Sequence, residues 1–422
     1  MKFIHAADLH IDSPLLGLCC YEGAPAERLR EATRRALEHL VELAVEEEVA
    51  FVILAGDLFD GKWRNMQTGL FTARQFRRLG DEQIRVFLVR GNHDAESTVR
   101  PAITWPDNVK EFSVRKVDTF RLDELGVALH GRGFAQPEVA DDPVPEYPAP
   151  VNGMFNIGVL HTNVGGSKEH PRYAPTTREA LEAKGYDYWA LGHIHKRYDI
   201  ADRPYIAYSG NTQGRHIRET GPKGGLLVSV EDGQLAGVEF RPTDVVRWHW
   251  PEITLADRDG LPELYAAVRE QLERCQTESD GRFAAVRLTI AGRCAAHNAL
   301  LGGATRAEAI AEIRNQANEL EEEVWVEEIR FDTSPAVDLE KLRAGGDLLG
   351  ELLRQIDDAA NDGDKLAALG RDHLAALEQS RPGLLEQAGV KLQDPAKLSS
   401  WLRQAEGLLV GQLLSGGDDE TA

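Results

Sequence analysis

Short clusters of aspartate, histidine and asparagine follow apolar runs along this chain. One such run, at residues 86–89, ends at Gly91-Asn92-His93-Asp94. A short apolar run bounded by glycine predicts a buried strand, and open α/β sheets carry their chemistry at the ends of such strands. Because asparagine, histidine and aspartate are also common in ordinary turns, this tetrapeptide alone leaves both interpretations open.

Four further clusters favour a functional site, because each also follows an apolar run of strand length. They are Asp8-Leu9-His10, Gly56-Asp57-Leu58-Phe59-Asp60, His161 and Gly192-His193-Ile194-His195. Two residues separated by one point the same way in extended geometry, so we expect the Asp8/His10 and His193/His195 pairs each to face one site. The candidate metal ligands are Asp8, His10, Asp57, Asn92, His161, His193 and His195.

The types of these ligands indicate the metal chemistry. They include no cysteine, which disfavours thiolate zinc and iron–sulfur sites. Mixed nitrogen and oxygen ligands suit Mn²⁺, Fe²⁺ or Zn²⁺ at two centres about 3.5–4 Å apart with one bridging carboxylate, for which Asp57 is the natural candidate. Two such cations neutralise a phosphodiester and generate hydroxide at neutral pH. The set therefore predicts in-line attack on phosphorus.

His93 lies beside a candidate ligand and is not needed as one. The task that two cations leave is protonation of the departing alkoxide, which requires a general acid. We therefore predict that His93 is this acid and that Asp94 fixes its tautomer by accepting the other ring N–H. The alternative is a histidine that only completes a turn.

The elements that must position these residues alternate between strand and helix. Apolar residues at helical spacing predict helices over 28–48 and 66–79, and with strands at 2–7, 51–55 and 86–89 they give a βαβαβ order. His130 is expected to be structural or to support the ligands. Further predicted elements are strands at 112–117, 119–122, 127–130, 155–160, 188–191, 205–208, 224–230 and 235–240, a helix at 177–184, and an exposed proline-rich loop at 136–151.

A basic loop separates the predicted strands at 205–208 and 224–230. It contains Arg215 and Arg218 among several glycines, with Lys223 close behind. We predict that these three side chains bind substrate phosphates; the alternative is a solvated turn.

The rest of the chain follows a second pattern. The order strand, helix, strand, helix, strand at 245–255, 261–275, 283–290, 306–320 and 324–331 argues for a small α+β domain. After residue 337 only helix signals remain. An apolar stripe there either packs back on the chain or docks a partner's helices; it comprises Leu398, Trp401, Leu402, Ala405, Leu408, Leu409 and Leu413.

The amino-acid composition limits the classes of function that we expect. The 422 residues suggest two or three domains, and the net charge of −21 argues against coating nucleic acid by bulk electrostatics. A polyanionic substrate would need metal ions or a partner's charge. The four cysteines are too few for a disulfide framework and fit a reducing cytoplasm. The amino terminus lacks signal-peptide character and no apolar run reaches membrane-spanning length, so we expect a soluble protein without membrane contact.

The ordered motifs resemble those of the calcineurin-like metallophosphoesterase superfamily. The series is Asp8-x-His10, Gly56-Asp57-x-x-Asp60, Gly91-Asn92-His93-Asp94, His161 and Gly192-His193-x-His195. Within the superfamily, the segments 7–12, 56–60 and 209–215 are most similar to SbcD-type DNA repair nucleases, with the YhaO group as the nearest match.

The resemblance implies an α/β fold with a four-layer αββα catalytic domain over residues 1–242. It further implies an α+β capping domain over 243–335, a helical region over 336–422, and Mn²⁺ as the usual metal. One centre would hold Asp8, His10, Asp57 and His195, and the other Asp57, Asn92, His161 and His193. His93 would be the general acid. Some relatives carry histidine where this chain has Asp60, so the role of Asp60 stays open.

The resemblance also implies partners. SbcD-type nucleases work with a coiled-coil ATPase of the SbcC type, for which YhaN would be the counterpart here, and a homodimer is a further expectation. The chain contains no Gly-x-x-x-x-Gly-Lys-Ser/Thr loop, so another subunit would have to supply any ATP dependence.

Three functions are compatible with this sequence. The first is a metal-dependent DNA exonuclease in DNA repair; the second is a phosphatase or pyrophosphatase acting on a small nucleotide or phosphoprotein; the third is a non-catalytic scaffold for an ATPase. The additional domain and helical region argue against the second, and the intact ligand set argues against the third. Polarity of digestion and preference for single or double strands stay open.

Overall fold

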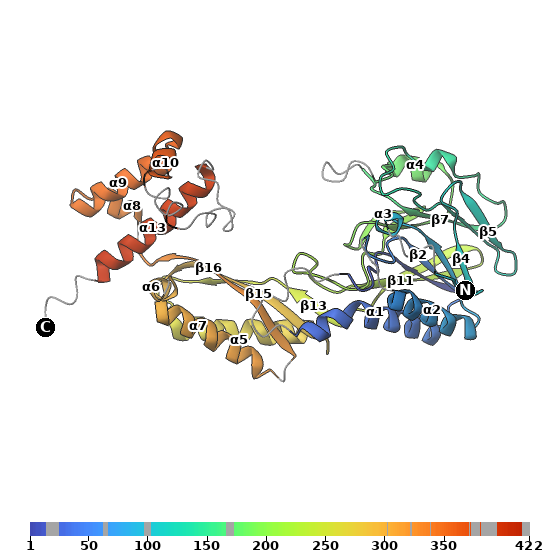
Figure 1. Cartoon of the computed structure of the whole chain (residues 1–422), viewed down its shortest axis with the longest axis horizontal. Coiled ribbons are helices and arrows are strands. Elements are labelled where there is room, and N and C mark those ends of the chain that lie inside the picture. The colour runs from blue at the N-terminus through green and yellow to red at the C-terminus, as the bar shows by residue number, and fades with distance from the viewer. Residues whose placement is uncertain are drawn as a thin grey trace. The chain divides into compact units, whose positions relative to one another are not determined.

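The computed structural model describes residues 1–13, 25–61, 66–96, 103–165, 173–301, 303–320, 323–337, 339–370, 372, 380 and 395–415 (Figure 1). The chain forms two compact units. The first comprises Met1–Trp250, Cys275–Val286 and Glu321–Glu327, and the second comprises Pro251–Arg274, Arg287–Leu320 and Glu328–Ala422. The division into domains at 1–242, 243–335 and 336–422 stays a prediction.

The first sheet of unit 1 contains the strands that precede the first three motifs. Its order is β12-β11-β1-β2-β3-β4, with β1 to β4 mutually parallel and β11 and β12 antiparallel. The strands are β1 (Lys2–Ala6), β2 (Phe51–Ala55), β3 (Arg85–Val89), β4 (Val109–Glu111), β11 (Gly224–Glu231) and β12 (Gln234–Pro242). Because β1, β2 and β3 are parallel, the polar residues after each of them lie at one edge.

The second sheet carries the later motifs. Its order is β5-β6-β7-β8-β10-β9, in which β6, β7, β8 and β10 are parallel. The strands are β5 (Asp118–Leu122), β6 (Val127–Gly131), β7 (Phe155–His161), β8 (Tyr188–Gly192), β9 (Tyr198–Asp202) and β10 (Tyr205–Tyr208).

The layers follow the predicted αββα order, with two sheets packed on each other and helices on both outer faces. Helices α1 (Ala26–Glu46) and α2 (Met66–Asp81) cover one face of the first sheet (Figure 1), and Leu40 of α1, Phe76 of α2 and Ile4 of β1 belong to the same buried core cluster. The other face packs on the second sheet through Phe3, which stacks on Phe51 and meets Tyr188 edge-on. Apart from Lys2, the residues of β1 and β2 are therefore buried on both faces of the sheet. The outer face of the second sheet is covered by α4 (Arg178–Ala183) and the turn η3 (Val144–Glu146).

Two buried histidines outside the set of candidate ligands join neighbouring strands. The ring of His5 on β1 bridges the two sheets, with Nδ1 3.0 Å from the Tyr188 hydroxyl and Nε2 3.1 Å from the Leu191 carbonyl. Burial lowers the pKa of His5 to about 4. His130 is held between Thr119 and Asn156, which fits the structural role expected for it.

Some predicted boundaries differ from the structure. The strand expected at 112–117 lies at Val109–Glu111, because the Asp118 carboxylate accepts the Ser113 N–H and turns the chain there. The loop at 136–151 is less exposed than predicted, since Val144 and Tyr147 are buried. The strand expected at 245–255 is two strands, β13 (Val246–His249) and β14 (Glu252–Leu255), because Pro251 lacks the N–H that a continuous ladder requires.

The α+β part follows the predicted order. Strands β13 and β14 both pair in parallel with β15 (Phe283–Cys294), and β16 (Val324–Pro335) also pairs with β15. The helices of this part are α5 (Leu261–Glu278), α6 (His297–Leu300) and α7 (Gly303–Asn318).

The carboxy-terminal part is helical, as predicted, and its helices pack on one another. Its helices are α8 (Leu339–Arg343), α9 (Leu348–Ala360), α10 (Gly363–Leu369) and α13 (Pro395–Ser415), and α13 contacts α9, α10 and α6. In the expected stripe Leu398 is buried whereas Leu413 is 52% exposed; the side chain of Leu408 lies outside the described residues. Among the described residues, no helix is both long and apolar enough to cross a bilayer.

Candidate metal centre

Both sheets deliver candidate ligands from the carboxyl ends of their parallel strands. Asp8 and His10 follow β1, and Asp57 follows β2. Asn92 opens the short helix α3 (Asn92–Glu96) after β3. From the second sheet, His161 is the last residue of β7 and the segment with His193 and His195 follows β8.

Four candidate ligands have left-handed backbone conformations. The φ angles are 52° at Asp8, 42° at His10, 52° at Asp57 and 104° at His193. The extended geometry expected for the Asp8/His10 and His193/His195 pairs is therefore wrong. The chain turns sharply at Asp8 and His10, and their N–H groups bond to the carbonyls of Gly56 and Asp57. Left-handed non-glycine residues are strained and gather at functional sites, where the surrounding structure holds them.

Two glycines allow the motifs to approach one another. A Cβ at Gly91 would lie 2.1 Å from Oδ1 of Asp57, and a Cβ at Gly56, where φ is +97°, would lie 2.3 Å from Nδ1 of His161. Only a residue without a side chain fits at these two positions.

The predicted ligand atoms fall into two groups that share Asp8, and Asp57 of the second group lies close to His10 of the first. Asp8, His10 and His195 form one group and Asp8, Asp57 and His161 another, with the ligand atoms of each group within 4.8 Å of one another. Oδ2 of Asp57 lies 3.3 Å from Nε2 of His161 and 3.8 Å from Nε2 of His10. This carboxylate therefore lies where a bridging ligand is needed.

Asn92 and His193 complete the second group. Oδ1 of Asn92 is 2.9 Å from Nε2 of His161. The ring of His193 lies beside that of His161, with centroids 5.2 Å apart, and its backbone N–H donates to both oxygens of Asp8. The structure thus brings together all seven predicted ligands.

The electrostatics of the site suit bound cations. Burial alone would lower the pKa of His161, but the carboxylates of Asp57 and Asp8 raise it to about 9. Burial would likewise raise the pKa of Asp57, yet His161 and His10 hold it well below its usual range. Burial lowers the pKa of His10 to about 3, so its ring is neutral and able to bind a metal. Buried carboxylates whose negative charge holds a proton on a neighbouring imidazole attract a metal ion in the same way, so the donor set fits two divalent cations.

The residue that contacts the ring of His93 differs from the expectation. Oδ1 of Asp60 is 2.9 Å from Nδ1 of His93. Asp94, which we expected there, accepts the backbone N–H groups of Leu58, Phe59 and Gly91 instead. Its position in the first turn of α3 directs its carboxylate back onto these amides, so Asp94 holds the loop after β2.

The basic loop is turned mostly inward. Arg215 has only 14% of its side chain exposed and lies 3.4 Å from Glu219. Lys223 is buried and donates from Nζ to the carbonyl of His195. Arg218 alone of the three predicted phosphate-binding residues is exposed. Sequence reasoning missed Glu219, whose only sequence signal is a single carboxylate in an otherwise basic segment.

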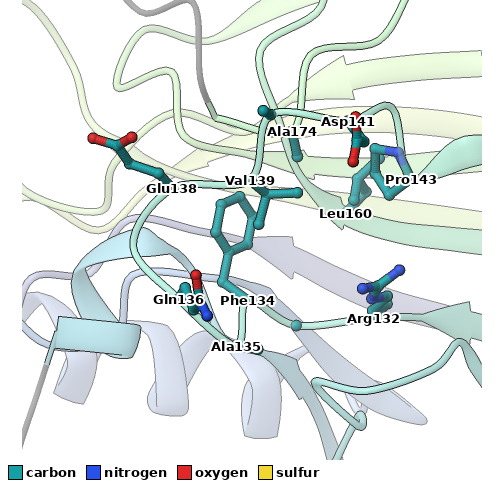
Figure 2. Close-up of a pocket in the computed structure, with 12 residues that line it drawn as sticks. Arg132, Phe134, Ala135, Gln136, Glu138, Val139, Asp141, Pro143, Leu160 and Ala174 are labelled. Carbon is teal, nitrogen blue, oxygen red and sulfur yellow. The ribbon is translucent and has the colours of Figure 1, made fainter.

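A cavity of about 310 Å³ lies beside the proposed ligand His161, because Phe134, which lines it, contacts the His161 ring. It is lined by the loop after β6 together with Leu160 and Ala174, and Figure 2 shows Phe134 rising from that loop toward Val139. The ring of Phe134 stands edge-on to His161 at 5.6 Å. One wall of the cavity therefore supports this ligand.

Comparisons with known proteins agree with this geometry. Residues 1–197 match the calcineurin-like phosphoesterase family, and residues 248–334 match the middle domain of the metallophosphoesterase YhaO. The uncharacterized metallophosphoesterase YhaO of Bacillus subtilis is 34% identical over 361 residues, which cover 85% of this chain and 87% of that protein.

Two solved structures are among the proteins to which the chain is similar. A dimetal phosphatase from Danio rerio is 12% identical with a TM-score of 0.35, covering 55% of this chain and 92% of that one. The TT1561 protein of Thermus thermophilus is 12% identical with a TM-score of 0.32, covering 57% of this chain and 98% of that one. On the family matches and the extent of its identity to YhaO, the chain belongs to the YhaO group of calcineurin-like metallophosphoesterases.

Proposed function

We propose that the chain is a metal-dependent phosphodiesterase that cleaves DNA as an exonuclease in DNA repair, with two Mn²⁺ ions at the metal centre. The observation that carries this proposal is Asp57, whose Oδ2 lies between an imidazole of each ligand group. When bound there, two divalent cations supply charge neutralisation at a phosphodiester and lower the pKa of the attacking water. Asp8, His10, Asp57 and His195 would hold one ion, and Asp57, Asn92, His161 and His193 the other.

His93 has the placement of a general acid. Its backbone N–H donates to Oδ1 of Asp57, which fixes the residue beside the ligand groups, while 40% of its side chain stays exposed. Contact between Nδ1 and Asp60 leaves Nε2 to give a proton to the leaving alkoxide. In this proposal Asp94 contributes indirectly, by holding the loop that carries Asp57.

An exposed arginine on the loop that contacts His195 supports a nucleic-acid substrate. Arg218 is exposed on the loop that reaches the centre, where it can meet a backbone phosphate. The net charge of −21 means that DNA binding would depend on the metal ions or on a partner's charge, and as that partner we propose a coiled-coil ATPase of the SbcC/YhaN type. The cysteine usage supports a cytoplasmic location within the same proposal.

Incubating the purified protein with labelled linear DNA and with p-nitrophenyl phosphate esters, in Mn²⁺ and in EDTA, tests the proposal. Degradation of DNA only with metal is the expected result. Turnover of a phosphomonoester without any cleavage of DNA would instead identify a phosphatase of small substrates. Absence of both activities in the metal-loaded protein would favour the scaffold function.

A further inference from the structure

The ring of His195 is paired with a buried carboxylate. Nδ1 of His195 lies 2.6 Å from Oε1 of Glu219, and the Glu219 side chain is 6% exposed. The other oxygen, Oε2, accepts the backbone N–H of Arg215 at 2.7 Å and the side-chain amide of Asn211 at 3.1 Å. Glu219 is therefore fixed by its own loop while it contacts the predicted ligand.

The same loop also holds the backbone of His195. The carbonyl of His195 accepts the N–H of Asn211 at 3.3 Å and Nζ of Lys223 at 3.1 Å. Gly210 allows this close approach: its φ is +77°, and a Cβ there would lie 3.1 Å from the His195 carbonyl oxygen. Residues 210–223 thus contact both the ring and the main-chain carbonyl of His195.

We infer that Glu219 is a positioning residue that orients His195 toward the metal. By accepting a hydrogen bond at Nδ1, the carboxylate keeps the proton on that nitrogen and leaves Nε2 to face the site. Nε2 lies 3.2 Å from Nε2 of His10, within the group that Asp8 completes. The inference rests on the metal centre of the proposed function and assigns residues 210–223 to that centre.

Arg215 belongs to the same arrangement. Its guanidinium lies 3.4 Å from Glu219 and 3.9 Å from Asp60, the two carboxylates that contact His195 and His93. One partly buried cation thus lies between the acidic partners of a proposed ligand and the proposed general acid. This placement explains why a loop rich in basic residues presents only part of its charge to solvent.

A purely structural Glu219 would hold the loop and nothing else, and metal affinity separates the two roles. Carboxylate partners of metal-bound histidines typically contribute 10- to 100-fold in metal affinity. Asp244 offers a matched control, because it is a buried carboxylate paired with Arg247 and Arg282 at 3.0 Å. Asp244→Asn should lower stability without changing Mn²⁺ affinity.

The experiment titrates Mn²⁺ into metal-free, full-length wild type, Glu219→Gln, Glu219→Asp and Asp244→Asn by calorimetry, with thermal unfolding in EDTA as the folding control. We expect Glu219→Gln to bind one of two Mn²⁺ ions roughly 10- to 100-fold more weakly, with an altered electron paramagnetic resonance spectrum. Glu219→Asp, which keeps the charge, should recover part of the loss. High Mn²⁺ should restore ester and DNA hydrolysis of Glu219→Gln together.

Two results would overturn the inference. One is wild-type Mn²⁺ affinity in a folded Glu219→Gln; the other is an equal loss in Asp244→Asn, which would reduce Glu219 to a structural carboxylate. A wild-type protein that binds Mn²⁺ and leaves phosphodiesters intact would defeat the proposed function alone, since the titration would still report on Glu219.

Discussion

Oδ1 of Asp60 lies 2.9 Å from Nδ1 of His93, so the residue whose role the sequence left open contacts the proposed general acid. Oδ2 of the same carboxylate accepts the hydroxyl of Ser13 at 2.6 Å, and Oδ1 lies 3.7 Å from Nδ1 of His10. A single carboxylate thus touches a proposed ligand and the proposed acid. Fixing one ring nitrogen in this way determines which nitrogen can give up a proton.

His93→Ala should separate metal binding from chemistry. The substitution removes the proton donor and no ligand, so metal content should stay near that of wild type while turnover falls by about 10²- to 10⁴-fold. Metal analysis alongside steady-state kinetics checks this, with Asp57→Asn as the variant expected to lose metal. A metal-free His93→Ala protein would end the assignment of His93 as general acid.

Asp60→Asn should act through His93. We expect turnover of DNA to fall by about 10- to 100-fold, and that of a p-nitrophenyl ester to fall less, because p-nitrophenolate leaves without needing a proton. In a His93→Ala background the same substitution should change turnover less than about threefold, since residues that act as a unit are not additive. Independent, additive losses in the double variant would contradict this coupling.

Arg218→Ala should weaken the binding of DNA without changing the hydrolysis of small esters. Loss of one phosphate contact weakens binding to all sequences alike and reduces the salt dependence of log K by about one unit of slope. Hydrolysis of a small ester should be unchanged. Arg215→Ala, by contrast, should lower both activities, because Arg215 lies between Glu219 and Asp60. Binding measured from low to moderate salt tests both variants, and an unchanged slope in Arg218→Ala would remove that residue from the DNA-contacting surface.

His5 should make the metal-free protein sensitive to acid. Burial lowers the pKa of its ring from 6.5 to about 4, so the unfolded chain binds the proton more tightly than the folded one. Above pH 6.5 the free energy of unfolding does not depend on this group. As the pH falls toward 4, protonation of His5 in the unfolded chain lowers the free energy of unfolding by up to about 3 kcal/mol. Urea unfolding of wild type and His5→Gln in EDTA at pH 7 and pH 5 measures this, and the variant should lose less stability between the two values. Equal losses would assign the acid sensitivity to other groups.

Deletion of residues 337–422 should leave a folded, metal-loaded enzyme. The helices α9, α10 and α13 pack mainly on one another, with a smaller contact between α13 and α6, so we expect their removal to spare the two sheets that carry the proposed ligands. We expect normal ester hydrolysis together with loss of the coiled-coil ATPase in co-purification. An insoluble product would make these helices part of the core, and a retained partner would locate the interface elsewhere.

The strands and the order of motifs follow from the sequence, because strands buried on both faces read as uninterrupted apolar runs and parallel pairing brings their ends together. The detailed geometry of the site could not be predicted from the sequence, because it depends on contacts between residues far apart in the chain. His10 and His195 are 185 positions apart, and the partner of His193 N–H is Asp8. The left-handed turns at Asp8 and His10, the inward direction of Lys223 and the role of Glu219 all depend on such contacts. Local patterns predict which side chains are basic or acidic, and tertiary packing decides which of them reach solvent.

The two sheets divide the proposed ligands between them, with Asp8, His10, Asp57 and Asn92 following strands of one and His161, His193 and His195 following strands of the other. A cation held by both sets would cross-link two layers that otherwise meet through side chains such as Phe3 and Tyr188. By linkage, metal at a hundredfold excess over Kd adds about 2.7 kcal/mol to the folded state. Metal affinity would consequently depend on how well the two sheets are aligned. A substitution deep in the interface between the sheets would then weaken metal binding without changing a proposed ligand.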